Sequence, residues 1–186
     1  MKVGKTTPVR FEARVKELVA EYPSVERIAT SLLAARAVLR REFNGFERQV
    51  RAMARNDTRA RLLMSTPGVG TIVALTYAAA IDDPCRFKSS KTVGAHFGLT
   101  PRRYQSGETD YSGRISKLGD SSVRAALYEA AHAILTKPLK GCTALKSWAM
   151  KIARRAGMNK AKVALARKLA IIMHRMLVDG TTFQSA

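Results

Sequence analysis

Residues 66–81, TPGVGTIVALTYAAAI, join a Pro-Gly-apolar-Gly turn directly to an apolar helix, and a short helix that begins at Asp57 precedes them. This pattern predicts a helix-hairpin-helix. Glycine permits backbone conformations that other residues resist, and it leaves main-chain N–H groups open to an approaching phosphate. The N-terminus of the following helix presents its positive dipole end at the same place. The turn is therefore predicted to contact a nucleic-acid backbone through Pro67, Gly68, Val69 and Gly70; a tight turn without a ligand is the alternative.

Helical patterns continue on both sides of this turn and predict an all-α fold. The expected organisation is a tail and one long, coiled-coil-like helix over residues 1–56, followed by a compact helical bundle over residues 57–186. The bundle would contain the helix-hairpin-helix and one long basic loop. Its helices are expected near residues 57–65, 71–82, 89–98, 120–138, 143–156 and 160–178.

The long helix, residues 24–55, carries apolar residues at coiled-coil spacing. One strict seven-residue seam consists of Val25, Leu32, Leu39, Phe46 and Met53. A helix of this length buries such a stripe against another helix, which belongs either to the same chain or to a second copy. The sequence leaves both partners open, and a homo-oligomer formed through this helix is expected.

The chain is strongly basic, with 33 Lys and Arg against 14 Asp and Glu and a net charge of +19. A field of this size usually has a polyanion to neutralise it, and nucleic acid is favoured over an anionic membrane. From residue 130 onward the only acidic residue is Asp179. The last helix is predicted to face phosphates through Lys160, Arg167, Lys168 and Arg175.

Residues 100–120, TPRRYQSGETDYSGRISKLGD, are expected to form the long basic loop, and a short hairpin within it is left open. Its cations are Arg102, Arg103, Arg114 and Lys117, and its candidate hydroxyl nucleophiles are Tyr104, Ser106, Ser112 and Ser116. Cations hold phosphate oxygens and a hydroxyl attacks phosphorus, but such chemistry usually also needs a base or a metal ion. Glu108 and Asp110 have no supporting carboxylate cluster, so no metal site is expected. Residue chemistry alone favours a phosphate-binding loop over a catalytic one.

No secretion or membrane signal is expected. The N-terminal residues MKVGKTTPVRFEARV contain no apolar core of a signal peptide, and the longest apolar run, IVALTYAAAI, is too short to span a bilayer. Cys85 and Cys142 are isolated, so they are expected to be reduced. A cytoplasmic location follows as a prediction.

Three blocks of this sequence together resemble one known family: PGVG, RFKSSKTVGAHFGLTPRRYQSG and GRISKLGD. The resemblance is to the C-terminal domain of insertion-sequence transposases of the IS-one-ten type, which are described as bridge-RNA-guided recombinases. It covers residues 58 to about 180, and the preceding helix is similar to the coiled-coil region of that family. It implies that this chain binds DNA and, in some contexts, a guide RNA.

The resemblance also implies a nucleophile. In that family the serine of a Tyr-x-Ser-Gly block becomes joined to DNA through a phosphoserine bond, and the matching residue here is Ser106, followed by Gly107. Nothing in the residues alone separates Ser106 from Ser112 and Ser116. The loop is expected to hold Ser106 among Arg102, Arg103 and Arg114.

One departure from the family pattern limits the expected activity. Family members place a resolvase-like domain with four metal-binding carboxylates ahead of this region, and this sequence contains no such domain. Mg²⁺ is therefore expected only through that missing domain, and the chain alone is expected to bind DNA and to cut it poorly or not at all. The alternatives are a catalytically silent nucleic-acid-binding remnant and a helical assembly module.

Overall fold

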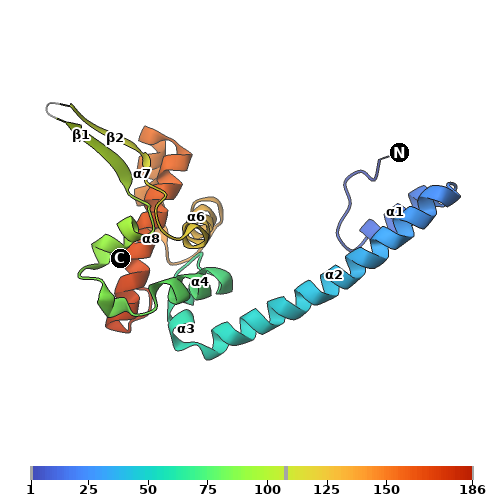
Figure 1. Cartoon of the computed structure of the whole chain (residues 1–186), viewed down its shortest axis with the longest axis horizontal. Helices are drawn as coiled ribbons and strands as arrows, with labels where there is room; N and C mark the ends of the chain where they lie inside the picture. Colours follow the sequence, from blue (N-terminus) through green and yellow to red (C-terminus); the bar gives the residue numbers. More distant parts are fainter. Residues whose placement is uncertain (1, 107–108, 186) are drawn as a thin grey trace. The chain divides into compact units, whose positions relative to one another are not determined.

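The predicted helices are present in a computed structural model that describes residues 2–106 and 109–185 (Figure 1). The all-α prediction is confirmed as the fold class, with one small two-stranded sheet as the addition. Within the described residues the α-helices are α1 (Phe11–Val19), α2 (Pro23–Asn56), α3 (Thr58–Met64), α4 (Thr71–Ile81), α5 (Ser90–His96), α6 (Ser121–Thr136), α7 (Thr143–Ala156) and α8 (Met158–Asp179). A single 3-10 turn, η1 (Pro84–Arg86), precedes α5.

The chain divides into unit 1, residues 1–49, and unit 2, residues 50–186. The predicted domain division after residue 56 stays a prediction. In unit 1, α1 lies against the first half of α2. The guanidinium of Arg36 lies 4.8 Å from the centre of the Phe11 ring, and the guanidinium of Arg40 donates to the carbonyl oxygen of Pro8 at 3.3 Å.

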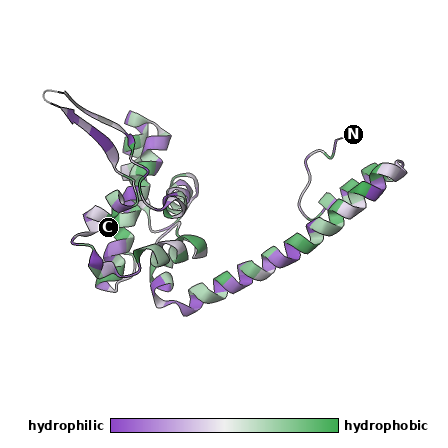
Figure 2. Cartoon of the chain, viewed as in Figure 1, coloured by the Kyte–Doolittle hydropathy of each residue, from purple (hydrophilic) through white to green (hydrophobic). Residues whose placement is uncertain are grey.

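Helix α2 confirms the long helix expected over residues 24–55, and it begins at Pro23, whose fixed φ suits a first helical position. Its apolar seam is exposed. Leu32 is 66% exposed and Leu39 is 70% exposed, and Val25, Phe46 and Met53 are exposed as well. Figure 2 shows apolar and polar stretches alternating along this helix. The described residues of the chain therefore leave this seam uncovered.

The core of unit 2 is built around α8, which contacts α3, α5, α6 and α7, while α4 packs on α3 and α6. Leu165, Leu169 and Met173 of α8 are fully buried. The Tyr77 hydroxyl of α4 donates to the carbonyl oxygen of Ala170 at 2.5 Å, and burial raises the pKa of this tyrosine. On the apolar side of α8, Val163 and Leu177 are half-buried, and the buried members include Ala166, Leu169, Ala170, Met173 and Met176.

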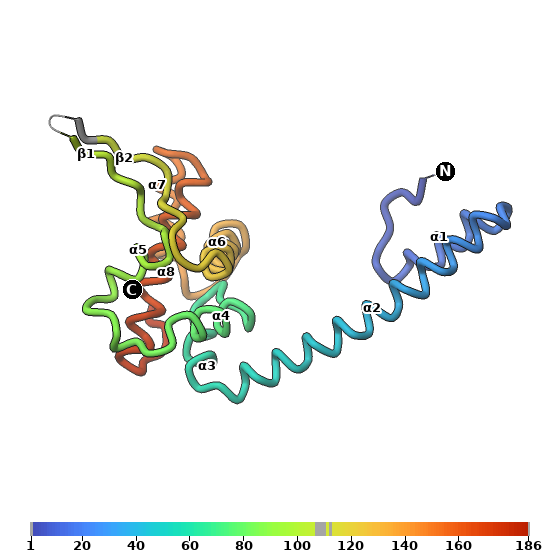
Figure 3. Tube along the Cα trace, viewed as in Figure 1, coloured from blue at the N-terminus to red at the C-terminus, as the bar shows by residue number. Residues whose placement is uncertain are grey.

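The segment expected as a basic loop, with a short hairpin left open, is an antiparallel ribbon of two strands, β1 (Pro101–Ser106) and β2 (Thr109–Ile115). The two strands run side by side along the trace in Figure 3. Tyr104, Tyr111 and Ile115 supply the aromatic and β-branched residues that strands favour. The sequence signal for strands is weak because every residue of β1 is exposed, so no apolar alternation marks a buried face.

Both cysteines are free, with Cys85 exposed and Cys142 buried. None of the helices in the described part of the chain has the length and apolarity needed to cross a membrane. The cytoplasmic location stays a prediction.

Candidate nucleic-acid interface and reactive serine

Ser106 is the last residue of β1 and is exposed at the end of the ribbon, where it pairs in register with Thr109. Side chains alternate between the two faces of a strand, so Tyr104 and Ser106 share one face and Arg103 lies on the other. Gly107 and Glu108, together with the side chains of Asp110 and Ser112, lie outside the described residues.

The predicted arginines are not gathered around Ser106. Arg102 stands four residues earlier, about 13 Å along the strand, and its Nη2 donates to the carbonyl oxygen of Ser116 at 3.2 Å. Arg114 lies near the end of β2 that is remote from Ser106. The ribbon therefore presents the serine at its tip and its arginine partners toward its base.

The base of the ribbon opens onto a groove of about 830 Å³ formed with α7 and α8. Its floor is apolar and includes Ile115, Trp148 and Val163. Its basic lining residues are Arg114, Lys117, Arg155, Lys160, Arg167 and Lys168, and none of its lining residues is acidic. A cleft lined by charges of one sign concentrates ligands of the opposite charge.

The groove unites residues that the sequence predicted separately. Arg114 and Lys117 come from the basic loop, whereas Lys160, Arg167 and Lys168 come from the last helix. Sequence reasoning missed Arg155 and Trp148 because α7 carries no motif. The cationic end of α7, with Arg154 and Arg155 in its last turn, was the available signal.

Two contacts orient cations of the groove. The Nζ of Lys168 lies 4.3 Å from the centre of the Trp148 ring, a cation–π contact. The aliphatic part of Arg167 lies against Gly94 of α5, where a Cβ atom would come within 2.8 Å of Arg167 Cγ. Gly94 is therefore required to be small because the Arg167 side chain passes over it.

Backbone contacts hold the base of the ribbon to the core. Gly98 and Gly119 have positive φ angles of +65° and +74°, and a Cβ at Gly119 would lie 2.1 Å from the carbonyl oxygen of His96. Arg124 of α6 binds both segments, because its Nη1 donates to three carbonyl oxygens, those of Phe97 (3.2 Å), Leu118 (2.8 Å) and Gly119 (2.9 Å). The GRISKLGD block thus contributes Leu118 and Gly119 to the anchor that positions the ribbon.

The Pro-Gly-Val-Gly turn connects α3 to α4 as predicted, but much of it serves the core. A Cβ at Gly68 would lie 2.9 Å from Ile134 Cγ1. Val69 is buried, and its N–H donates to the carbonyl oxygen of Thr66. Pro67 is half-buried. Gly70 faces open space immediately before α4. Gly70 and the start of α4 are therefore the part of this turn that a ligand can reach.

Comparison with known proteins finds a similar family. Residues 60–147 match the model of the transposase IS116/IS110/IS902 family. Over these residues the chain is similar to this transposase family. The match includes the turn, the ribbon and its anchor, and it confirms the resemblance found in the sequence.

Several curated transposases are similar to this chain. The transposase for insertion sequence element IS1111A of Coxiella burnetii is 32% identical over 169 residues, which is 90% of this chain and 46% of that protein. A probable family 20 transposase of Pseudomonas aeruginosa is 33% identical over 74% of this chain and 41% of its own length. The transposase for insertion sequence element IS1328 of Yersinia enterocolitica is 31% identical over 87% of this chain and 48% of its own length. The chain spans about half the length of these relatives.

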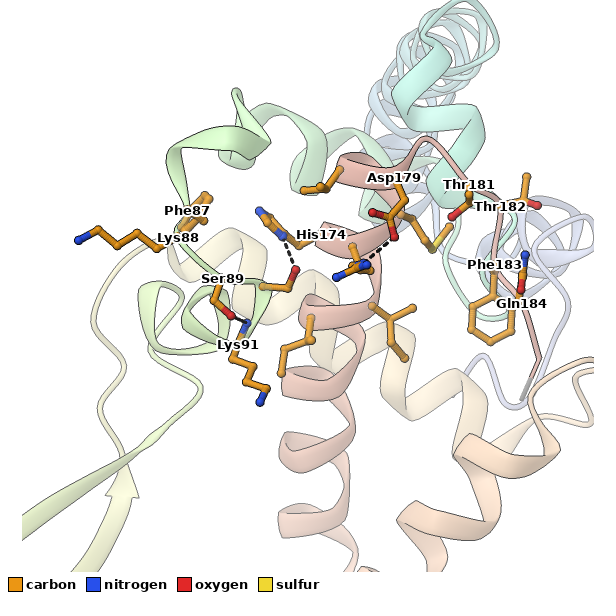
Figure 4. A pocket seen from close by; sticks show the side chains of 16 residues that line it. Phe87, Lys88, Ser89, Lys91, His174, Asp179, Thr181, Thr182, Phe183 and Gln184 are labelled. Carbon is orange, nitrogen blue, oxygen red and sulfur yellow. Dashed lines mark hydrogen bonds and ion pairs between the residues drawn. The ribbon is translucent and has the colours of Figure 1, made fainter.

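Arg175 stands apart from the groove. It lines a separate pocket near the end of α8, and its Nε donates to Asp179 Oδ2. Figure 4 shows this pocket, with His174 and Asp179 among its labelled residues. The buried His174 beside Arg175 is satisfied by the protein. Its Nε2–H donates to the carbonyl oxygen of Pro84 at 3.0 Å, and its Nδ1 forms a hydrogen bond of 2.9 Å with the Ser90 hydroxyl. Arg175 is therefore paired with Asp179 and is not among the residues that line the groove.

The described residues of this chain do not form a metal site. No three His, Cys, Asp or Glu side chains among them lie together as a ligand set. Mg²⁺ prefers several oxygen ligands, usually including carboxylates, and the groove residues offer cations instead. The Mg²⁺ implied by the family resemblance therefore does not fit the donor groups that the structure describes.

Proposed function

We propose that this chain is the part of a transposase that binds nucleic acid and supplies Ser106 as the nucleophile of DNA strand cleavage and transfer. Similarity to the transposase family supports a role in transposition. The observation that carries the proposal is the arrangement of the ribbon. Its tip exposes Ser106, and its base opens onto a groove with six basic residues and no acidic one.

The groove would hold the phosphates of the nucleic acid. Arg114 comes from β2 and Lys160 and Arg167 come from α8, and all three line one groove, so a backbone lying in it would meet several cations together. Contacts of this kind position the ligand without reading its sequence. Gly70, at the exposed start of α4, would add a backbone contact of the helix-hairpin-helix type.

The chemical step would be a transesterification. The Ser106 oxygen would attack the phosphorus of a phosphodiester, so an Oγ–P bond forms and one bond between phosphorus and a deoxyribose oxygen breaks. The hydroxyl proton passes to a base or to solvent, and the leaving oxygen takes up a proton. The phosphoserine conserves the energy of the phosphodiester, and a second hydroxyl reverses the exchange to complete strand transfer.

We expect the chain to need partners for this step. The described side chains lack a metal site, so a separate resolvase-like domain would have to complete the catalytic centre. A guide RNA is the second proposed partner. A second copy of the chain is the third, since the exposed seam of α2 has the spacing of a coiled-coil interface.

The test is a covalent-trapping assay. The chain is incubated with labelled DNA of an element end and Mg²⁺, with and without a separately expressed resolvase-like domain and guide RNA. A denaturation-resistant protein–DNA band is expected only with the added domain. Ser106→Ala should abolish the band, whereas the control Ser116→Ala should retain it.

Two results would contradict this function. A band that persists in Ser106→Ala would show that another residue is the nucleophile. Salt-sensitive DNA binding without any band, even with the added domain and RNA, would favour the catalytically silent binding module.

A further inference from the structure

Two exposed tyrosines form a parallel stack on the ribbon. Tyr104 of β1 and Tyr111 of β2 pair in register, their ring centres are 4.9 Å apart and their planes are inclined by 14°. Tyr104 is 46% exposed and Tyr111 is 56% exposed. An isolated two-stranded ribbon has little stability in water, so this aromatic pair stabilises the ribbon but leaves large ring surfaces in solvent.

Gly113 links this stack to the cationic groove. A Cβ at this position would lie 3.1 Å from Tyr104 Cε2, so the absence of a side chain leaves room for the tyrosine ring. Gly113 also lines the groove, beside Arg114 and Ile115. The aromatic pair and the basic groove are therefore neighbouring parts of one surface of unit 2.

We propose that Tyr104 and Tyr111 bind an unpaired nucleobase of a strand whose phosphates lie in the groove. This inference rests on the proposed function and specifies its ligand as single-stranded nucleic acid, either DNA or RNA. Within a duplex, the faces of a base are covered by its neighbours, whereas an unpaired base offers a flat surface to an aromatic ring. Cations that hold the backbone beside an aromatic platform are the general arrangement of single-strand binding.

The position of the stack also concerns the reactive serine. Tyr104 and Ser106 are two residues apart on the same face of β1, which is about 7 Å along a strand. A base stacked on Tyr104 would therefore place its strand close to the Ser106 hydroxyl. The tyrosines act as positioning residues for the strand, and no bond to them forms or breaks.

Fluorescence anisotropy on the full chain tests this inference. Three labelled oligonucleotides of equal length would be compared: single-stranded DNA, single-stranded RNA and duplex DNA. Tyr104→Ala and Tyr111→Ala should each weaken single-strand binding about tenfold or more and should leave duplex binding within about twofold. Tyr104→Phe keeps the ring and should bind like the wild type. Tyr22→Ala removes an equally exposed tyrosine of unit 1 and should have no effect.

A second readout reports stacking directly. An oligonucleotide that contains 2-aminopurine should lose fluorescence on binding to the wild type and to Tyr104→Phe, and should lose less with Tyr104→Ala. Whether the DNA or the RNA oligonucleotide loses more fluorescence shows which nucleic acid supplies the base.

Equal binding of single strands to the wild type and to the alanine variants would overturn the inference. If substitution of the groove cations still weakens binding of these strands, the proposed function stands. When no oligonucleotide binds in a salt-dependent manner, both the inference and the proposed function fail. Circular dichroism of each variant verifies that the helices are intact.

Discussion

Helix α8 and strand β1 are adjacent to the same groove, yet their side chains have opposite surroundings. Leu165, Leu169 and Met173 of α8 are fully buried, whereas all six residues of β1 are exposed. The helix therefore contributes to the stability of unit 2, and the ribbon presents groups to a ligand. Substitutions in the two regions should consequently change different quantities: the free energy of unfolding in one, and the affinity for nucleic acid in the other.

The largest effect on stability is expected at the anchor that holds the ribbon to the core. Gly119→Ala places a Cβ 2.1 Å from the His96 carbonyl oxygen at a φ of +74°, and we expect it to lower the free energy of unfolding by about 3 kcal/mol. Urea unfolding measures this change. As a control, Gly45→Ala in the middle of α2 meets no atom within 4 Å and should raise stability by about 0.5–1 kcal/mol. An unchanged free energy of unfolding in Gly119→Ala would show that Gly119 does not anchor the ribbon.

The apolar seam of α2 extends the comparison, because it is a helical surface that is exposed like the ribbon. We expect Leu32→Asp combined with Leu39→Asp to weaken self-association by about 100-fold, since buried charges at seam positions lose their hydration. Analytical ultracentrifugation without nucleic acid measures it. The control, Thr30→Asp with Asn44→Asp, adds the same charge at exposed positions off the seam. Equal effects of the two pairs would exclude the seam as the interface.

Substitution of groove cations should change the affinity for nucleic acid without changing the free energy of unfolding. Arg155→Gln combined with Lys160→Gln should weaken binding of nucleic acid about tenfold and reduce the slope of log affinity against log salt by roughly 2. Both side chains are exposed, so the unfolding curve should stay the same. Arg14→Gln with Lys16→Gln, in unit 1, is the charge-matched control. A slope that does not change would show that phosphates lie elsewhere.

The smallest effect is expected inside the core. Tyr77→Phe removes the hydroxyl that donates to Ala170 and should lower the free energy of unfolding by about 1 kcal/mol at neutral pH. Burial raises the pKa of Tyr77 above its ordinary value of 10.0, so the folded state holds this proton longer than the unfolded state. Wild-type stability should therefore fall as the pH rises above that ordinary value, and the variant should lose less. Parallel urea titrations across this pH range measure the difference.

The same contrast explains how far the sequence could be interpreted. Helices were predictable because apolar periodicity and capping residues are local, and Asp57 and Asp120 cap α3 and α6 through their side chains. The ribbon was harder to predict because its stability depends on cross-strand pairs such as Tyr104 and Tyr111, whose register a sequence does not display.

The groove could be predicted only in part. Its cations are separated by up to 54 positions in the chain, from Arg114 to Lys168, so only the fold brings them together. Arg124 does not line the groove. In the structure its guanidinium donates to three backbone carbonyl oxygens, which makes it part of the anchor.

Hydrogen exchange measured with and without nucleic acid tests the central claim most directly. The claim is that the helices of unit 2 support a ribbon and groove that bind nucleic acid. We expect a single-stranded oligonucleotide to slow exchange in residues 101–106 and 109–115 and at the start of α8, with no change in α6 or in the buried second half of α4. Slower exchange confined to other elements, with the ribbon unaffected at saturating oligonucleotide, would contradict the claim.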